Sequence, residues 1–281
     1  MKSFYLSILL AFMYAISIAN AYSQRVYANT QEDSHTFLLA DVFDPDYAID
    51  ADISNFSRLQ VNVGLIGSIG TATQNLQFTG VLKPASTAPL MIRFRYAGAV
   101  LGLSNAFRLQ RTNGGLDQTV GQAYTGSTLL GLLGLDEAED TGEFTVPVPA
   151  TGTPSDGVEI RLSALLGVGP SAEVFYAFFI TPPIIEFPTV AVCETQDALI
   201  SISNFQPGYT YRVYDALTDG NLIQSGTTNV LSIPEEDLTP GTYYLEAVEG
   251  GTAFTSSRTA FDIVIYPKPG YPEIDLNVNE N

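Results

Sequence analysis

The stretch from Val174 to Pro188, VFYAFFITPPIIEFP, is the strongest constraint on the fold, because a dense aromatic segment runs directly into three prolines. Proline donates no hydrogen bond to a β-ladder and fixes φ, so a sheet has to stop at Pro182, Pro183 and Pro188. Short segments of alternating β-type residues lie on both sides of it. We therefore expect two β-domains, with residues 181–188 as a stiff linker that holds them end to end.

The composition indicates a globular chain with a strand-rich interior. Hydrophobic residues make up 46% of the 281 residues and charged residues only 15%, which is too apolar for a disordered protein. Residues that favour strands are abundant, and no long segment keeps a helical period. Many short strands without alternating helices predict an all-β protein made of two β-sandwich domains.

The first 21 residues have the pattern of a secretory signal peptide. Lys2 supplies the positive end, Phe4–Ile18 the apolar run, and Ala19-Asn20-Ala21 a cleavage site of small residues. The apolar run is short for a transmembrane helix, and no second stretch approaches membrane length. We expect an exported mature chain that begins near Tyr22, lies at the cell surface or outside the cell, and has no membrane span.

The formal charge of −18 limits the classes of partner. So acidic a protein repels phosphate backbones, which argues against nucleic acid as a ligand. The acidic side chains suit an exposed, soluble surface, and they also attract Ca²⁺.

The first domain is expected over residues 22–180. Its clearest strand is Leu90–Tyr96, in which Leu90 and its alternate neighbours face one way while Arg93 and Arg95 face the other. Residues 127–135 predict a short helix or an apolar loop. The remaining strands are expected near Arg25–Asn29, Thr36–Phe43, Leu59–Val63, Leu76–Phe78, Phe107–Gln110, Phe144–Val148, Gly157–Leu162 and Ala172–Phe179.

The second domain is expected over residues 189–266, followed by a flexible tail at 267–281. Strand patterns at Val190–Glu194, Ala198–Ser203, Tyr209–Asp215, Asn221–Ser225, Thr242–Glu249 and Arg258–Tyr266 are separated by turn residues. About seven short strands in this length predict an immunoglobulin-like sandwich.

Two segments of the first domain resemble a known fold. PDYAIDADISNFSRLQV (45–61) is similar to the opening of discoidin-like, galactose-binding-like jelly rolls, and SDGVEIRLSALLGVGPSAEVFYAFF (155–179) is similar to their closing strands. The same segments resemble N-terminal modules of exported Bacteroidetes surface proteins. Ala51 replaces the usual glycine of the pattern, and Asn55-Phe56 stands where a threonine and an aromatic residue are common. The resemblance implies a jelly-roll sandwich.

The second domain resembles an Ig-like repeat of Bacteroidetes surface and gliding-associated proteins. The resemblance rests on CETQDALISISNFQPGYTYRVYDALTDGNLIQSG (193–226) and LTPGTYYLEAVEGGTAFTSSRTAFDIVI (238–265). The family pattern has a second cysteine where this chain has Ala253-Phe254, so its usual disulfide cannot form. Cys193 is the only cysteine, and we expect a buried, inert thiol packed against Phe254.

Catalytic signals are weak. His35 is the only histidine, and it lies in a polar segment with no nucleophile motif nearby. Carboxylate pairs occur at Asp50/Asp52, Glu137/Glu139 and Glu235/Glu236, and a glycosidase uses such a pair. We interpret them as solvated loop acids and expect no enzymatic activity.

Two candidate binding features remain. Asp44, Asp46, Asp50 and Asp52 supply the oxygen ligands that Ca²⁺ prefers, although they lack the spacing of an EF-hand, so a structural Ca²⁺ is a candidate and no other cofactor is indicated. Tyr47 and Phe56 are candidates for stacking against a sugar ring.

The sequence as a whole favours a non-catalytic, exported surface module that serves in adhesion or spaces a binding domain from the cell. Surface glycans or other surface proteins are the expected partners. A carbohydrate-binding module is one alternative, and a set of accessory domains from a larger secreted enzyme is another.

Overall fold

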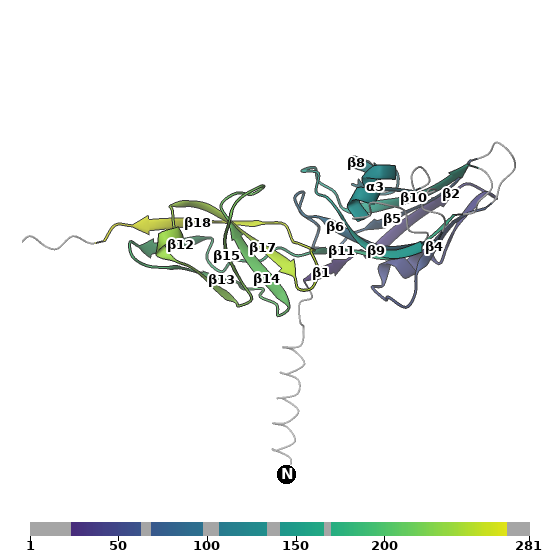
Figure 1. Ribbon diagram of the computed structural model, residues 1–281. Coiled ribbons are helices and arrows are strands. Elements are labelled where there is room, and N and C mark those ends of the chain that lie inside the picture. The colour runs from purple at the N-terminus through teal and green to yellow at the C-terminus, as the bar shows by residue number, and fades with distance from the viewer. Residues whose placement is uncertain (1–23, 63–68, 98–106, 134–140, 166–169, 269–281) are drawn as a thin grey trace, which may run out of the picture. The chain divides into compact units, whose positions relative to one another are not determined.

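The computed structural model describes residues 24–62, 69–97, 107–133, 141–165 and 170–268 (Figure 1). The predicted signal peptide lies outside these residues, as does most of the predicted tail. The chain divides into two compact units: the first is Met1–Pro182 together with Ala247–Arg258, and the second is Pro183–Glu246 together with Thr259–Asn281. Both are built almost entirely of strands, so the predicted all-β sandwich fold is confirmed.

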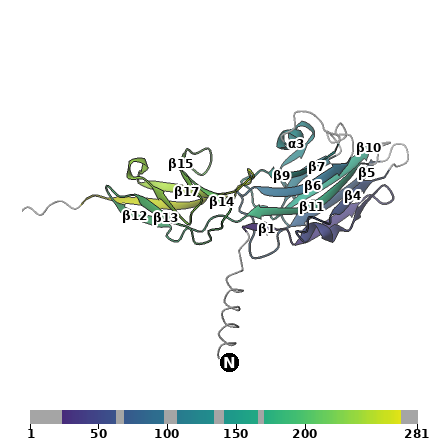
Figure 2. The same cartoon turned by 60° about the horizontal axis from the view of Figure 1, so that its bottom comes forward.

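The first unit contains two antiparallel sheets, which are layered face to face (Figures 1 and 2). Sheet A has the strand order β3-β4-β11-β6-β9, and β1 pairs with the end of β11. Its strands are β1 (Arg25–Tyr27), β3 (Ala40–Phe43), β4 (Ser57–Val61), β6 (Leu90–Ala97), β9 (Thr141–Val148) and β11 (Ser171–Ile180). Sheet B has the order β2-β5-β10-β7-β8. Its strands are β2 (Thr30–His35), β5 (Ile69–Gln77), β7 (Phe107–Thr112), β8 (Thr119–Thr125) and β10 (Gly157–Leu165).

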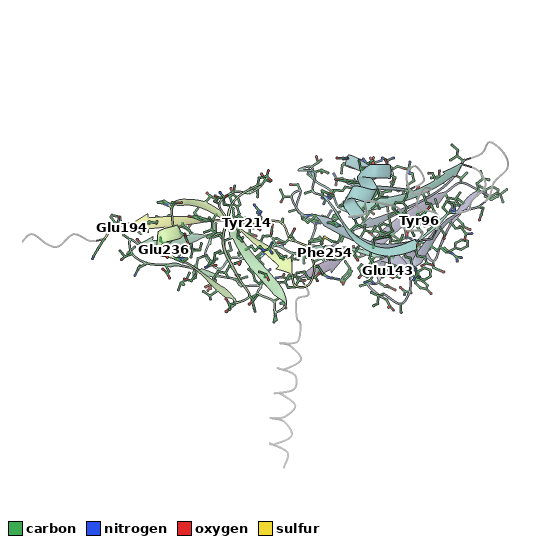
Figure 3. All side chains as sticks on the ribbon, viewed as in Figure 1. Tyr96, Glu143, Glu194, Tyr214, Glu236 and Phe254 are labelled. Atoms are coloured by element: carbon green, nitrogen blue, oxygen red, sulfur yellow. The ribbon has the colours of Figure 1, made fainter. Side chains whose placement is uncertain are left out.

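The hydrophobic core lies between these two sheets. Leu90, Ile92 and Phe94 of β6 are fully buried, and Tyr96 (Figure 3) is 2% exposed, so the alternation predicted for this strand is confirmed. Across the core, the ring of Phe94 stacks on that of Phe107 from sheet B, with centroids 4.9 Å apart. Aromatic pairs of this kind join the two layers.

Two short helices lie beside the edge strands of the sandwich. The 3₁₀ helix η1 (Pro45–Ile49) contacts β2 and β4, and its Ala48 is fully buried. The helix α3 (Gly126–Leu133) contacts β8 and β9 and buries Leu129. The short helix predicted near residue 127 is therefore present, and it packs against the core.

The second unit has a five-stranded sheet and a two-stranded sheet. The larger has the order β12-β18-β17-β14-β15, in which β12 and β18 are parallel. The smaller pairs β13 with β16. The strands are β12 (Thr189–Cys193), β13 (Ala198–Ser201), β14 (Tyr209–Tyr214), β15 (Leu222–Gly226), β16 (Val230–Ile233), β17 (Gly241–Glu249) and β18 (Thr259–Tyr266), with a 3₁₀ turn η3 (Glu235–Asp237) before β17.

A tyrosine corner stabilises the entry to β17. The hydroxyl of Tyr243 donates to the carbonyl oxygen of Thr239 and accepts from its N–H, both at 3.0 Å. A tyrosine bonded to the backbone a few residues upstream is a hallmark of Ig-like sandwiches.

The segment predicted as a linker carries backbone hydrogen bonds within the second unit. Ser203 donates to the carbonyl of Ile184 at 2.8 Å, and Glu186 donates to Ser201 at 3.0 Å. Ile185 forms an isolated bridge with Ile202. Residues 184–186 thus lie alongside the chain that follows β13. The domain limits drawn from the sequence stay a prediction.

Two local expectations are wrong. Thr36–Phe43 is not one extended segment: residues 37–39 form a turn in which Leu38 has a φ of 64°, and β3 begins only at Ala40. Cys193 is not buried either, because it ends the edge strand β12 and is exposed. The ring of Phe254 instead packs edge-on against Phe178, at a centroid distance of 6.0 Å.

Candidate functional site

The predicted calcium ligands follow one another through η1 and the turn after it. Asp44 precedes the helix with a left-handed φ of 50°. Asp46 accepts a hydrogen bond from Gln31 at 3.2 Å. Asp50 accepts from the N–H of Asp52 at 2.8 Å and from the amide of Asn55 at 2.7 Å.

Asp52, like Asp50, accepts a hydrogen bond from the N–H two residues later in the chain. Its Oδ1 accepts from both the N–H and the hydroxyl of Ser54 at 2.8 Å. These hydrogen bonds, the backbone one first, lower the pKa of the Asp52 carboxyl below its ordinary value. Asp50 and Asp52 therefore act as turn-forming side chains.

Nothing in the described part of the chain gathers three or more His, Cys, Asp or Glu side chains in the manner of a metal site. The four aspartates are thus not brought together as a set of ligands. Calcium binding at these positions stays a prediction from the sequence.

The two predicted sugar-stacking residues differ in exposure. Tyr47 lies on η1 and is 46% exposed. Phe56 is half-buried: its ring packs edge-on against Phe175 at 5.8 Å, and the guanidinium of Arg95 lies 5.6 Å above it. Tyr47 keeps an accessible ring, whereas Phe56 is part of a packed aromatic cluster.

The candidates for catalysis are scattered. Nδ1 of His35 lies 4.0 Å from Oδ1 of Asp41 on an exposed part of the first unit. Glu235 and Glu236 form the exposed turn η3 (Glu236 in Figure 3), where the N–H of Glu235 donates to Asp197 at 3.2 Å. Glu137 and Glu139 lie outside the described residues. None of these observations indicates a reaction.

Arg93 and Arg95 point outward from sheet A, as the alternation predicts, and both are paired. Arg93 donates to Glu143 of β9 (Figure 3) at 2.7 Å through Nε, and Arg95 donates to Glu173 at 2.5 Å. Both guanidinium groups also lie over the ring of Phe175, at 5.7 and 5.5 Å. On this face, each arginine is therefore paired with a glutamate and also lies over an aromatic ring.

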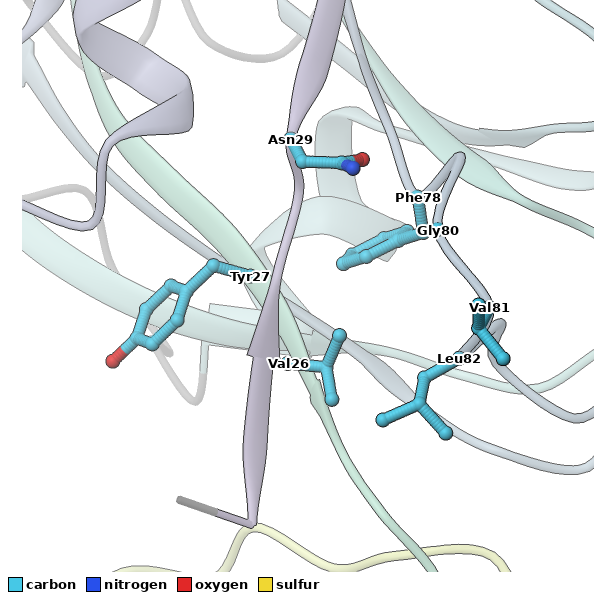
Figure 4. Close-up of a pocket in the computed structure, with 7 residues that line it drawn as sticks. All are labelled: Val26, Tyr27, Asn29, Phe78, Gly80, Val81 and Leu82. Atoms are coloured by element: carbon cyan, nitrogen blue, oxygen red, sulfur yellow. The ribbon is translucent and has the colours of Figure 1, made fainter. Parts of the chain in front are cut away.

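A small apolar pocket of about 300 Å³ lies beside β1 (Figure 4). Val26 and Tyr27 form one side of it, and Phe78, which is almost fully buried, forms another. Val81 and Leu82 complete it and are exposed. The sequence analysis did not predict this pocket.

The outer face of sheet B is polar over three successive rows of residues, and the sequence analysis did not predict it. The alternate residues Leu76, Val158 and Leu109 point into the core, so the residues between them point outward. The strand registers place these outward residues in rows, namely Thr30-Gln77-Gly157-Thr112, Glu32-Asn75-Glu159-Gln110 and Ser34-Thr73-Arg161-Arg108. Every member with a side chain is polar.

The β7–β8 loop, residues 113–118, crosses this face and buries part of it. The N–H of Leu116 donates to Glu32 at 2.7 Å, and that of Asp117 donates to Glu159 at 3.0 Å. Arg161 forms an ion pair with Asp117. Beneath the loop, Asn75 and Glu159 are no more than 1% exposed.

Several buried polar atoms on this face have no hydrogen-bond partner. They are Oγ1 of Thr30, Nδ2 of Asn75, Oε1 of Glu159, and Nε of both Arg108 and Arg161. Oε1 of Glu159 lies 3.3 Å from Nη2 of Arg161, an ion-pair distance without a hydrogen bond. Because buried polar atoms are nearly always paired, a group of such atoms on one sheet singles out this face.

Comparisons with known proteins place only the second part of the chain in a family. Residues 181–267 match the model of the "Ig-like domain CHU_C associated" family. The predicted Ig-like, Bacteroidetes-type domain is thereby confirmed for this stretch. Among curated protein sequences, none matches the chain significantly.

Solved structures with a similar arrangement include two adhesin domains and a glucanase. The chain is 13% identical to the β-1,2-glucanase from Parabacteroides distasonis, with a TM-score of 0.33, and the match covers 89% of this chain and 37% of that one. The chain is 10% identical to the adhesin domain of Epf from Streptococcus pyogenes, with a TM-score of 0.33, and the match covers 86% of this chain and 94% of that one. It is 11% identical to the K1 adhesin domain of Lys-gingipain from Porphyromonas gingivalis, with a TM-score of 0.25, and the match covers 56% of this chain and 90% of that one. Likenesses this weak carry no inference about ligand or activity.

In the part of the chain that the structure describes, no helix is long and apolar enough to cross a membrane.

Proposed function

We propose that this chain is a non-catalytic, exported module of a cell surface, in which the first unit takes part in adhesion and the second acts as an Ig-like spacer. The observation that carries the adhesive role is the outer face of sheet B, where three successive rows of residues carry only polar side chains. Such side chains offer hydrogen-bond donors and acceptors to a ligand. The signal-peptide pattern of residues 1–21 supports export.

The pairing of the acidic side chains supports a role without catalysis. Glu143 and Glu173 bind the arginines of sheet A, while Glu32 and Glu159 bind backbone N–H groups of the β7–β8 loop. A catalytic carboxylate instead faces an open site and carries a pKa matched to its task. These carboxylates serve structure.

The discoidin-like jelly roll is the finer fold that we propose for the first unit. Two layered antiparallel sheets, with the segments 45–61 and 155–179 on neighbouring strands, are compatible with it. A carbohydrate-binding module with its site near Tyr47 is the alternative that an exposed ring favours, since Tyr47 is 46% exposed.

Two measurements test this proposal. The full-length chain is expressed in a Bacteroidetes host, and intact cells are treated with proteinase K; we expect the chain to be degraded while a cytoplasmic marker survives. The purified mature chain is then incubated with neutral and acidic polysaccharides, and we expect no new reducing ends. Hydrolysis that disappears in Asp50→Asn/Asp52→Asn or in Glu235→Gln/Glu236→Gln would overturn the non-catalytic assignment.

A further inference from the structure

Two large apolar side chains stand at the tip of the turn between β2 and β3, and we call them the knob. Phe37 is 80% exposed and Leu38 is 77% exposed. Leu38 has a left-handed φ of 64°, which costs a bulky residue free energy, and its exposed side chain gains little packing within the unit to offset that cost. Single exposed hydrophobics are common, whereas an adjacent and strained pair indicates a contact surface.

The turn that carries the knob is held from both sides. Leu39 and Ala40 donate backbone hydrogen bonds to the carbonyl of Thr36, at 3.0 and 2.9 Å. The carbonyl of Leu39 accepts from the N–H of Asn62 at 2.8 Å. A Cβ on Gly70 would lie 2.5 Å from that carbonyl oxygen, so the close approach requires glycine. The backbone beneath the knob is therefore fixed before binding, which lowers the entropy cost of a contact.

The apolar pocket beside β1 is large enough for such a side chain. Its volume is about 300 Å³, whereas a cavity of about 150 Å³ already holds a benzene ring. The side chains of Val26, Phe78 and Leu82 surround it (Figure 4), and Val81 at its rim is fully exposed. An aromatic or aliphatic group that enters this pocket is removed from water together with the pocket walls.

The knob and the pocket lie at opposite ends of the β2–β5 strand pair. In the register of this pair, Thr30 is opposite Gln77 at one end and His35 is opposite Ala72 at the other. Phe78 of the pocket directly follows the first end, and the knob follows the second. Because β2 is six residues long, ~20 Å separates the two features. The knob therefore cannot enter the pocket of its own chain, but it can enter that of a second copy.

The charges beside the knob and the pocket are complementary. Asp33 and Asp41 flank the knob in the sequence; Asp33 is exposed, and the side chain of Asp41 is 44% exposed. Lys83 directly follows Leu82 of the pocket, its side chain is 56% exposed, and its ion pair with Asp156 is long, at 3.7 Å. A knob that enters the pocket of a second copy thus brings carboxylates towards an ammonium group. An anionic bilayer would be repelled by the same carboxylates.

We propose that the first units of two copies bind head to tail, with the knob of one chain in the apolar pocket of the next. The two surfaces differ, so each bound copy leaves a knob or a pocket free, and the contact extends into an array. Two side chains bury less area than the roughly 1,000 Å² that a stable interface needs, so the contact is weak and acts where many copies face one another. This goes beyond the adhesive role proposed for sheet B and names a second copy of the chain as a partner.

The test follows, by light scattering, the clustering of beads that carry the mature chain at high density through a C-terminal biotin. The knob variant is Phe37→Ser/Leu38→Asn, in which asparagine keeps the left-handed turn. The pocket variant is Val81→Asp/Leu82→Asp, which places carboxylates at two exposed positions of the rim. Melting curves confirm that both variants are folded.

The matched control is Leu199→Ser/Leu222→Ser in the second unit, where the two leucines are 60% and 53% exposed. We expect wild-type and control beads to cluster equally. Beads that carry either the knob variant or the pocket variant should cluster about tenfold more slowly, because each lacks one half of the contact. A mixture of the two kinds of bead should cluster again, since each supplies the surface that the other lacks.

Several results would overturn this proposal. Dispersed wild-type beads would show that copies do not bind one another. Clustering that survives in the pocket variant, or a mixture that stays dispersed, would show that the knob does not bind this pocket. Binding to phosphatidylcholine vesicles that is lost only in the knob variant, with wild-type beads dispersed, would make a lipid surface the occupant. Export and the lack of catalysis would still be decided by the protease and polysaccharide experiments.

Discussion

Arg25 and Glu249 form a bidentate ion pair although they lie 224 residues apart in the sequence. Nε of Arg25 is 2.7 Å from Oε1 of Glu249, and Nη2 is 2.7 Å from Oε2. The guanidinium also lies 4.3 Å above the ring of Phe178. The hydrogen bond to Glu249 raises the pKa of Arg25, so the guanidinium stays charged at every physiological pH. This contact holds the segment Ala247–Arg258 within the first unit.

We expect a double-mutant cycle with Arg25→Met and Glu249→Gln to give a coupling energy of about 1–2 kcal/mol. The side chains are 24% and 15% exposed, so solvent screens the pair only in part. Urea unfolding of the first unit gives the four free energies. Arg93 and Glu143 provide a matched comparison, because they are more exposed, at 31% and 33%. Their coupling should be smaller, about 0.5 kcal/mol, and equal couplings would contradict this account.

The thiol of Cys193 should react quickly in the native protein. It is exposed at the end of an edge strand, so a thiol reagent such as DTNB needs no unfolding to reach it. We expect labelling of the native chain at a rate close to that of the urea-unfolded chain. Labelling that begins only in urea would show that the thiol is protected.

The sequence predicted best the strands whose core-facing residues are large and apolar. β6 was predicted almost to the residue, because Leu90, Ile92, Phe94 and Tyr96 recur at every second position and Arg93 and Arg95 lie between the last three. The aromatic strand β11 was found from a different signal, the continuous apolar run VFYAFFI, whose residues are all buried. An alternating apolar pattern is the direct sequence signal of a half-buried strand.

The strands of sheet B were found less well, and the candidate site was missed with them. β5 buries Gly70, Ala72 and Gln74 on the side that faces inward, so no run of large apolar residues marks it. β2, with the sequence TQEDSH, has no apolar residue at all. Such strands are defined by pairing with neighbours far away in the sequence. A polar face assembled from β2, β5, β10 and β7 together has no local signature.

The prediction that Cys193 is buried was wrong because it came from the family resemblance. In the structure, Cys193 ends an edge strand and is exposed. In the pattern that the second domain resembles, this cysteine forms a disulfide with a second cysteine. Here its partner position is Ala253-Phe254, and the ring of Phe254 packs with Phe178 instead. Without a partner, no covalent constraint turns the side chain inward.

Arg111 is a buried cation whose loss should destabilise the first unit. It is fully buried and donates to the hydroxyl of Ser155 at 2.9 Å and to the carbonyls of Pro149 and Ala88 at 3.0 and 2.8 Å. Burial lowers its pKa to about 10, so it remains charged at neutral pH. We expect Arg111→Met to cost about 3 kcal/mol, because it leaves buried acceptors without donors.

Arg108→Met on the same strand is the control for this measurement. Arg108 points to the opposite face of sheet B and is half-buried, so its loss should cost under about 1 kcal/mol in urea unfolding. A similar cost for the two variants would mean that the hydrogen bonds of Arg111 contribute little.

The last prediction concerns the tyrosine corner of the second unit. Tyr243 is 4% exposed, and its hydroxyl bonds both the N–H and the carbonyl of Thr239. Tyr243→Phe keeps the ring, which packs against Phe261 at a centroid distance of 5.9 Å, and removes only the hydroxyl. Two part-buried backbone groups then lose their partner, so we expect a loss of about 1–2 kcal/mol. The melting temperature of the second unit should fall by about 5–10 °C. Tyr244→Phe on the outward side of the same strand is the matched control, and it should leave that transition almost unchanged. Equal shifts for the two variants would show that the corner does not stabilise this sandwich.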